Sequence, residues 1–224
     1  MNTAGGVGVG AGLRTVVLIS GGGTNLQAII NQVGSGELHI NLQAVVSDRP
    51  EILGLERAAK ANIPTRIVDY SKFDRRADAE QALSATLHRL QPELLILAGF
   101  MRILPASLVS EYYGRMLNIH PSLLPKFRGL DTYRRAIQAK ETWHGSTVHY
   151  VTPELDAGPS IIQYKVRIYP DETELSLSTR VQQGEYIIYP RAIGWIADRR
   201  LQLKHGEVWL DGLPLAEPVV INES

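Results

Sequence analysis

The sequence predicts an α/β protein: a Rossmann-like fold with a mostly parallel central sheet and helices on both faces. Short apolar runs rich in valine and isoleucine alternate with segments in which apolar residues recur at helical spacing. This alternation is typical of strands buried on both faces and joined by crossover helices. Longer strands in the second half of the chain predict a mixed or antiparallel C-terminal extension of the sheet.

The first half of the chain is expected to supply four strands and three crossover helices. The strands are expected at residues 15–19, 42–46, 65–68 and 94–98, and the helices at residues 25–33, 52–61 and 75–90. In the third helix, Ala79, Leu83 and Leu87 recur every four residues and so share one face.

The second half begins with a fifth strand, which starts at Met116 and ends near His120. Two longer strands are expected at residues 146–152 and 160–169, followed by a helical stretch from residue 173 to about 199. Pro190 lies inside that stretch and is expected to kink or interrupt it, because proline lacks the backbone N–H and clashes with the preceding turn.

The length of 224 residues suits a single domain, which we place at residues 14–212. The glycine-rich residues 1–13 are expected to form a flexible tail, and residues 213–224 a loose C-terminal tail.

The composition excludes several classes of function. The 23 basic residues balance 23 acidic ones, so no long-range field attracts nucleic acid or a membrane surface. Cysteine is absent, which excludes thiolate metal sites, cysteine nucleophiles and disulfides. The start of the chain does not resemble a signal peptide, and no apolar stretch approaches the roughly 20 residues that span a bilayer. We therefore expect a cytoplasmic protein.

A glycine turn, Ser-Gly-Gly-Gly-Thr-Asn at residues 20–25, follows the first strand and opens the first helix. Bare amides at a helix start can hold a phosphate. A tight turn capped by Thr24 or Asn25 explains a lone glycine loop at least as well. A dinucleotide site fits less well, because the third glycine of its fingerprint would fall at Leu26, so a monophosphate is the better ligand.

Asn118 and His120 form the second candidate, since residues two apart on a strand point to the same face. A structural histidine bonded to a carbonyl would explain His120 alone, but two polar groups on an apolar strand weaken that explanation. Asp156, in a loop after a later strand, could orient and charge His120 or only fix its own turn. Spacing leaves this choice open. No two histidines have metal-binding helical spacing, and no metal is expected.

Several motifs in register resemble the folate-dependent formyltransferases of purine synthesis, and within them the branch that acts on glycinamide ribonucleotide. They are SGGGTNLQAI at residues 20–29, LAGFMRIL at 97–104, LNIHPSLLP at 117–125 and the stretch 144–159. The resemblance runs in order from Val16 to about Asp211. It implies formyl transfer from the cosubstrate 10-formyltetrahydrofolate to the primary amine of glycinamide ribonucleotide, by an enzyme that is a monomer or homodimer.

The resemblance also implies roles for individual residues. Asn118, His120 and Asp156 match catalytic positions. The phosphate loop is matched by Gly23, Thr24 and Asn25, and the acid that grips the ribose by Glu185. Walls of the folate pocket, with apolar surface from Leu97 and Val151, are matched by Met101, Arg102, Ile103, Leu104, Asn118, Thr152, Pro153, Glu154 and Leu155.

Two positions depart from the family pattern. Gly22 stands where a larger residue is expected, and Arg128-Gly129 is more similar to the tRNA formyltransferase relatives. The other histidines are assigned no chemistry; among them, His149 could line the site but is better explained as a supporting residue. Two other classes remain open: a non-catalytic nucleotide- or folate-binding module, and a Rossmann-type oxidoreductase.

Overall fold

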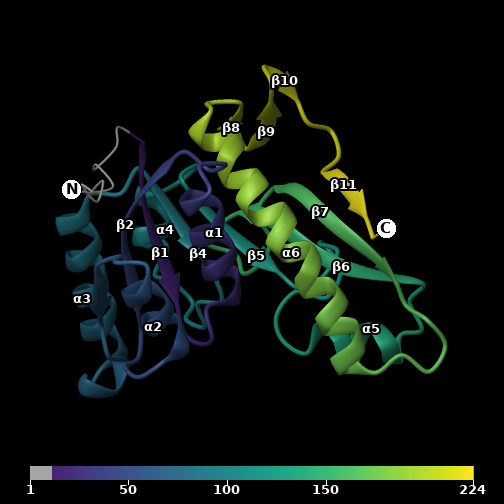
Figure 1. The fold of residues 1–224 in the computed structure, drawn as a ribbon, viewed down its shortest axis with the longest axis horizontal. Helices are drawn as coiled ribbons and strands as arrows, with labels where there is room; N and C mark the ends of the chain where they lie inside the picture. The colour runs from purple at the N-terminus through teal and green to yellow at the C-terminus, as the bar shows by residue number, and fades with distance from the viewer. Residues whose placement is uncertain (1–11, 224) are drawn as a thin grey trace, which may run out of the picture.

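A computed structural model describes residues 12–223, and its main element is an eight-stranded sheet (Figure 1). The strand order is β11-β7-β6-β5-β4-β1-β2-β3. The strands are β1 (Leu13–Ile19), β2 (Ile40–Ser47), β3 (Thr65–Ile67), β4 (Leu94–Leu97), β5 (Met116–His120), β6 (Trp143–Tyr150), β7 (Ser160–Arg167) and β11 (Val219–Asn222). The five strands from β3 to β5 are parallel, and β6 runs antiparallel to both β5 and β7.

Helices cover both faces of this sheet because its strands alternate apolar side chains between the two sides. Val17 and Ile19 face one core, whereas Val16 and Leu18 face the other. The first core is closed by α1 (Thr24–Gly34), α2 (Leu53–Lys60), α5 (Thr132–Gln138) and α6 (Glu174–Ala197). The second is closed by α3 (Arg76–Leu90) and α4 (Ala106–Glu111). The expected fold class is confirmed.

A second, three-stranded antiparallel sheet follows α6 and confirms the expected mixed extension. Its strands are β8 (Leu201–Lys204), β9 (Glu207–Leu210) and β10 (Leu213–Pro214). A short 3₁₀ helix, η1 (Tyr70–Lys72), lies between β3 and α3.

The predicted boundaries need three corrections. Leu13 begins β1 instead of ending a tail; the rest of that predicted tail, up to residue 11, lies outside the described residues. β6 spans Trp143–Tyr150, so it starts and ends earlier than expected. Pro190 does not interrupt α6, because the residues around it, such as Tyr189 and Ala192, are fully buried against the sheet and that packing offsets the lost hydrogen bond.

The expected loose end at residues 213–224 is also wrong for the part that the structure describes. β11 adds to the sheet edge in parallel with β7 and lies beside it in Figure 1. Arg180 of α6 forms ion pairs with Glu223 and Glu172, which hold this end in place. The position at the end of the chain predicted a loose segment, whereas backbone pairing to an open sheet edge orders it.

The order of the strands sets the position of the site. β1 and β4 are neighbours, and the chain leaves them in opposite directions along the sheet, toward β2 and β5. Ligands of open α/β sheets bind at such a switch point, outside the carboxyl ends of the strands. The loops that follow β1, β4 and β5 therefore meet at one edge.

Candidate active site

The glycine loop after β1 ends in a backbone conformation that glycine favours. Gly23 is the N-cap of α1 with φ 68° and no side-chain cap. The alternative in which Thr24 or Asn25 caps the turn is therefore wrong. Their side chains turn toward α6 instead, where Gln182 Nε2 donates to Thr24 Oγ1 at 3.2 Å. The first-turn amides of α1, which have no partners within the helix, remain the anion-binding feature of this loop.

Hydrogen bonds tie this loop to the one that follows β4. The Ser20 N–H donates to the Gly99 carbonyl at 3.1 Å, and the Met101 N–H donates to Ser20 Oγ at 2.8 Å. The two loops on either side of the switch point are thus joined into one rim.

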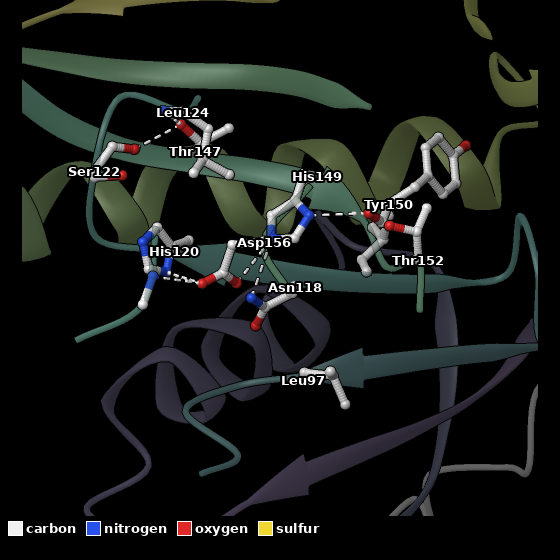
Figure 2. A network of polar contacts seen from close by, with 12 residues as sticks. Leu97, Asn118, His120, Ser122, Leu124, Thr147, His149, Tyr150, Thr152 and Asp156 are labelled. Atoms are coloured by element: carbon white, nitrogen blue, oxygen red, sulfur yellow. Dashed lines mark hydrogen bonds and ion pairs between the residues drawn. The ribbon is translucent and has the colours of Figure 1, made fainter. Parts of the chain in front are cut away.

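His120 and Asp156 meet at the end of β5, although they are 36 positions apart in the chain (Figure 2). His120 Nδ1 lies 3.3 Å from Asp156 Oδ2, and both side chains are less than a tenth exposed. Asp156 Oδ2 also accepts from the Gly129 N–H at 3.0 Å. Asp156 is held by contacts beyond its own turn, so fixing that turn is not its whole function.

The other ring nitrogen of His120 faces the Phe127 carbonyl oxygen at 3.0 Å. His120 Nε2 thus bonds a carbonyl, while Nδ1 lies within ion-pair distance of a carboxylate; an imidazole can donate to both acceptors at once only as the doubly protonated cation. The structural alternative, a histidine bonded to a carbonyl, describes one half of this geometry. The carboxylate of Asp156 supplies the other half.

His149 completes the cluster from the neighbouring strand β6, where it lies opposite Asn118. Its Nδ1 donates to the Tyr150 carbonyl at 2.9 Å, and its Nε2 accepts from Asn118 Nδ2 at 3.1 Å (Figure 2). Burial lowers the pKa of His149 to about 4, against the opposing effects of the Tyr150 carbonyl and the Asp156 charge. His149 is thus neutral at pH 7, and its 3.8 Å approach to Asp156 is not an ion pair.

A second buried polar pair connects the glycine loop with α6. Asn25 Nδ2 donates to Glu185 Oε2 at 2.7 Å, and Asn25 Oδ1 is buried without a hydrogen-bond partner. Burial raises the pKa of Glu185 to about 7, while the bond from Asn25 acts in the opposite direction. A buried carboxyl and an unpaired amide oxygen are the groups that sugar hydroxyls can satisfy.

The predicted folate walls differ from this buried pair. Met101 and Ile103 are exposed, at 65% and 55% of their surface, while Leu104 and Leu97 are buried in the second core. Arg102 Nε donates to Asp48 at 2.6 Å, and the guanidinium lies over the ring of Tyr70. The side chain of Arg102 is therefore committed to the protein.

The second wall, at residues 152–155, follows β6. Thr152 is partly buried, whereas Pro153, Glu154 and Leu155 are exposed. Glu154 forms an ion pair with Arg128 at 2.7 Å, which joins this wall to the loop after β5. The departure at Arg128 thus has a local partner, although an exposed pair of this kind contributes little stability.

Sequence reasoning missed two residues of the site, and it treated a third, His149, as a supporting residue without chemistry. Phe127 was not considered. Thr147, fully buried, donates to Ser122 O at 2.7 Å and accepts from the Leu124 N–H at 3.0 Å, so it fixes the start of the loop after β5 (Figure 2). The period of two along β6 places Thr147 and His149 on one face and could have indicated both.

Two kinds of feature are absent from residues 12–223. No helix there is long and apolar enough to cross a membrane. Within the same range, no three histidine, aspartate or glutamate side chains are grouped so that they could hold a metal ion.

Known proteins are similar to this chain over most of its length. The formyl transferase family matches residues 13–193. A phosphoribosylglycinamide formyltransferase of Escherichia coli is 46% identical over 89% of this chain and 94% of the relative. That of Haemophilus influenzae is 40% identical over 94% of this chain and 99% of the relative.

A solved structure agrees with these relatives. The phosphoribosylglycinamide formyltransferase of Coxiella burnetii superposes with a TM-score of 0.89 at 50% identity, over 94% of this chain and 99% of that one. The residues that the family matches, 13–193, include every loop of the site. The chain belongs to the formyl transferase family.

Proposed function

We propose that this protein is a phosphoribosylglycinamide formyltransferase of purine biosynthesis. It transfers a formyl group from 10-formyltetrahydrofolate to the primary amine of glycinamide ribonucleotide, and releases tetrahydrofolate. Relatives that bear this name match nearly the whole chain. The observation that carries the proposal is His120, which lies between the Phe127 carbonyl and the Asp156 carboxylate and next to the amide of Asn118, at the switch-point edge of the sheet.

The chemistry requires donors for a developing negative charge. The amine nitrogen attacks the formyl carbon, and a C–N bond forms as the carbonyl oxygen becomes an oxyanion. Cationic His120 and the Asn118 NH₂ group are the donors for that oxyanion. A donor of this kind contributes about 10²- to 10³-fold in rate. When substrate is bound, the oxyanion takes the place of the Phe127 carbonyl as the acceptor of the hydrogen bond from His120 Nε2.

Asp156 orients the ring of His120 through the contact at Nδ1. When the tetrahedral intermediate collapses, the bond between the formyl carbon and folate N10 breaks, and the amine proton moves to N10. Because His120 is committed to the oxyanion, a water held by Asp156 carries that proton. His149 is a positioning residue, since its lone pair holds the Asn118 amide with its NH₂ group toward the cluster.

The ribonucleotide lies along the glycine loop. Gly23, Thr24 and Asn25 hold its phosphate at the start of α1, and Glu185 accepts hydrogen bonds from the ribose hydroxyls. The buried Asn25–Glu185 pair supports this assignment.

The folate lies against the two loop walls. Backbone groups of residues 101–104 and 152–155 read the pterin ring, and Asn118 meets the formyl group at the junction with the catalytic cluster. Buried Leu97 and Leu104 below these loops supply the apolar floor that such pockets have.

A coupled assay tests the function. Purified protein receives glycinamide ribonucleotide and 10-formyltetrahydrofolate, and tetrahydrofolate is measured together with the formylated ribonucleotide. We expect both products in equal amounts, and loss of both in His120→Ala. Tetrahydrofolate that forms without the formylated ribonucleotide would indicate a hydrolase instead. A protein that binds both ligands without turnover would be a binding module, and tight binding of reduced nicotinamide would favour an oxidoreductase.

We also propose a cytoplasmic location, as a monomer or homodimer with no nucleic-acid or membrane partner. The balanced charge supports the absence of these two partners. Sedimentation of the purified protein at several concentrations measures the oligomeric state.

A further inference from the structure

The three successive glycines of the phosphate loop are held from one side by α2. The Gly54 N–H donates to the Gly21 carbonyl at 3.1 Å, and Arg57 Nε donates to the Gly22 carbonyl at 2.9 Å. Successive carbonyls of the loop thus each have a donor from the same helix. Without such donors, three glycines have more conformational freedom to lose on ordering than any other three residues.

The loop and α2 also pack too closely for a side chain at Gly23 or at Gly54. A Cβ atom on Gly23 would lie 2.7 Å from the Gly54 Cα, and one on Gly54 would lie 2.5 Å from Ile19 Cδ1. Close contact therefore requires glycine at position 54. Backbone conformation does not, because the φ of Gly54 is not positive. This close approach brings Arg57, one turn further along α2, within reach of the loop.

The guanidinium of Arg57 is itself fixed. Its Nη1 donates to Gln27 Oε1 at 3.1 Å, and Gln27 Nε2 donates to Asn31 Oδ1 at 2.9 Å on α1. These residues line a cavity of about 340 Å³ beside Thr24, and Arg57 is the one cationic side chain in its lining. Arg57 of α2 thus bonds both α1 and the glycine loop that precedes α1.

We infer that Arg57 is a positioning residue for the phosphate of the ribonucleotide, an inference that rests on the proposed function. In a trans peptide, the carbonyl and the N–H of the next residue point in opposite directions. By holding the Gly22 carbonyl, Arg57 therefore aims the Gly23 N–H away from α2. Gly54 does the same for the Gly22 N–H through the Gly21 carbonyl. Both amides are thereby aligned before the phosphate arrives.

Steady-state kinetics give the first test. Arg57→Gln should raise the KM for the ribonucleotide about tenfold, as expected for loss of a charge-assisted hydrogen bond, and leave the KM for the folate within about twofold. Arg57→Lys keeps the positive charge but lacks the planar set of N–H donors of the guanidinium, so its KM for the ribonucleotide should lie between those of the wild type and Arg57→Gln. Lys60→Gln is the matched control, because it removes the same charge from an exposed position on α2. Equal changes for Arg57→Gln and Lys60→Gln would overturn the inference.

A double-mutant cycle separates loop ordering from simple charge. At Gly22, φ is not positive and a Cβ would meet nothing within 4 Å, so alanine fits there and restricts the free loop. If Arg57 acts by ordering the loop, Gly22→Ala should recover about two- to fivefold of the ribonucleotide KM in the Arg57→Gln protein and change the wild type less. Strictly additive effects would contradict the inference.

Hydrogen exchange of the free protein tests the same idea without any substrate. Arg57→Gln should speed amide exchange in residues 22–25 and leave the strands of the sheet unchanged. Unaltered exchange in this loop would overturn the inference. If the wild-type protein does not formylate the ribonucleotide, the proposed function fails, but the exchange result still decides whether Arg57 orders the loop.

Discussion

The proposed catalytic cluster and the proposed folate walls lie at the same edge of the sheet but are built in different ways. In the cluster, Asp156 and His149 contact the strand residues His120 and Asn118 through side chains that are largely buried. In the walls, Met101 and Leu155 are exposed at 65% and 50%, and the side chain of Arg102 is turned back to Asp48.

The difference separates two tasks. Reacting atoms need groups fixed before substrate arrives, because reorganising them during reaction raises the barrier. A planar ring system can instead be read by backbone groups and covered by adaptable apolar side chains. We therefore expect substitutions in the cluster to affect turnover, and side-chain substitutions in the walls to have small effects.

The largest effect is expected for Asp156→Asn. Turnover should fall by roughly 10²- to 10⁴-fold, as for loss of a positioned acid–base or orienting partner. Asparagine tolerates the positive φ of 48° at this position, so the protein should still fold. Single-turnover kinetics with both substrates saturating measure the chemical step.

Asp131→Asn is a matched control, because Asp131 also has a positive φ, 57°, but is exposed and pairs with Arg134 instead of a histidine. Its turnover should stay within about twofold of wild type, the usual result for a surface change. Near-normal turnover in Asp156→Asn would return that residue to a turn-fixing function.

The next effect concerns Glu185, a buried side chain like those of the cluster. Its pKa of about 7 in the folded protein exceeds its ordinary value of 4.5, so between these pH values the folded state binds more protons than the unfolded state. The contribution of Glu185 to the free energy of unfolding is therefore largest below about pH 4.5, and it is lost as the pH rises through about 7. The loss amounts to about 3 kcal/mol.

Glu185→Gln removes this titration and should also raise the KM for the ribonucleotide by about tenfold, through loss of the charged acceptor. Urea unfolding of both proteins at several pH values measures the difference, and subtraction cancels the other titrating groups. The mutant should gain stability relative to wild type as the pH rises from 5 to 8. A constant difference would mean that Glu185 is not desolvated in solution.

A smaller effect is expected where the backbone alone makes the site. Gly23→Ala places a Cβ at a positive φ and against Gly54, which should lower the free energy of unfolding by roughly 1–3 kcal/mol and raise the ribonucleotide KM. Gly22→Ala is the adjacent control, without strain or contact. Thermal unfolding and KM are measured for both. Equal effects of the two substitutions would contradict the geometry of the loop.

The sequence carried most of the fold and the centre of the site for a physical reason. Parallel strands and crossover helices leave a strong periodic pattern, and a polar pair such as Asn118 and His120 on an apolar strand is a local signal. Asp156 was found through resemblance, because no spacing rule relates residues that only the fold brings together. β11 was missed because pairing to a sheet edge depends on the edge and not on the segment.

His149 and Arg57 show a further limit of sequence reasoning. His149 has a defined function only because Asn118 lies opposite it in the β5–β6 pairing. Arg57 looks like any charged residue in the last turn of a helix, and its contact with Gly22 depends on the close approach of Gly54 to the loop. Such functions come from the register and distance between elements, which a single sequence does not encode locally.

The smallest effect is expected for Met101→Ala in the exposed wall. The backbone N–H of Met101 is held by Ser20 Oγ and does not depend on the side chain, so the loop should keep its shape. The folate KM should rise less than about threefold, the loss of a partial apolar contact, with turnover unchanged. Leu104→Ala is the comparison within the same loop, because Leu104 is only 8% exposed and its loss leaves a cavity under the wall. That variant should lower thermal stability and raise the folate KM more than Met101→Ala does. If Met101→Ala proved the more damaging of the two, its side chain and not the backbone would read the folate, and the distinction between a side-chain cluster and backbone walls would no longer hold.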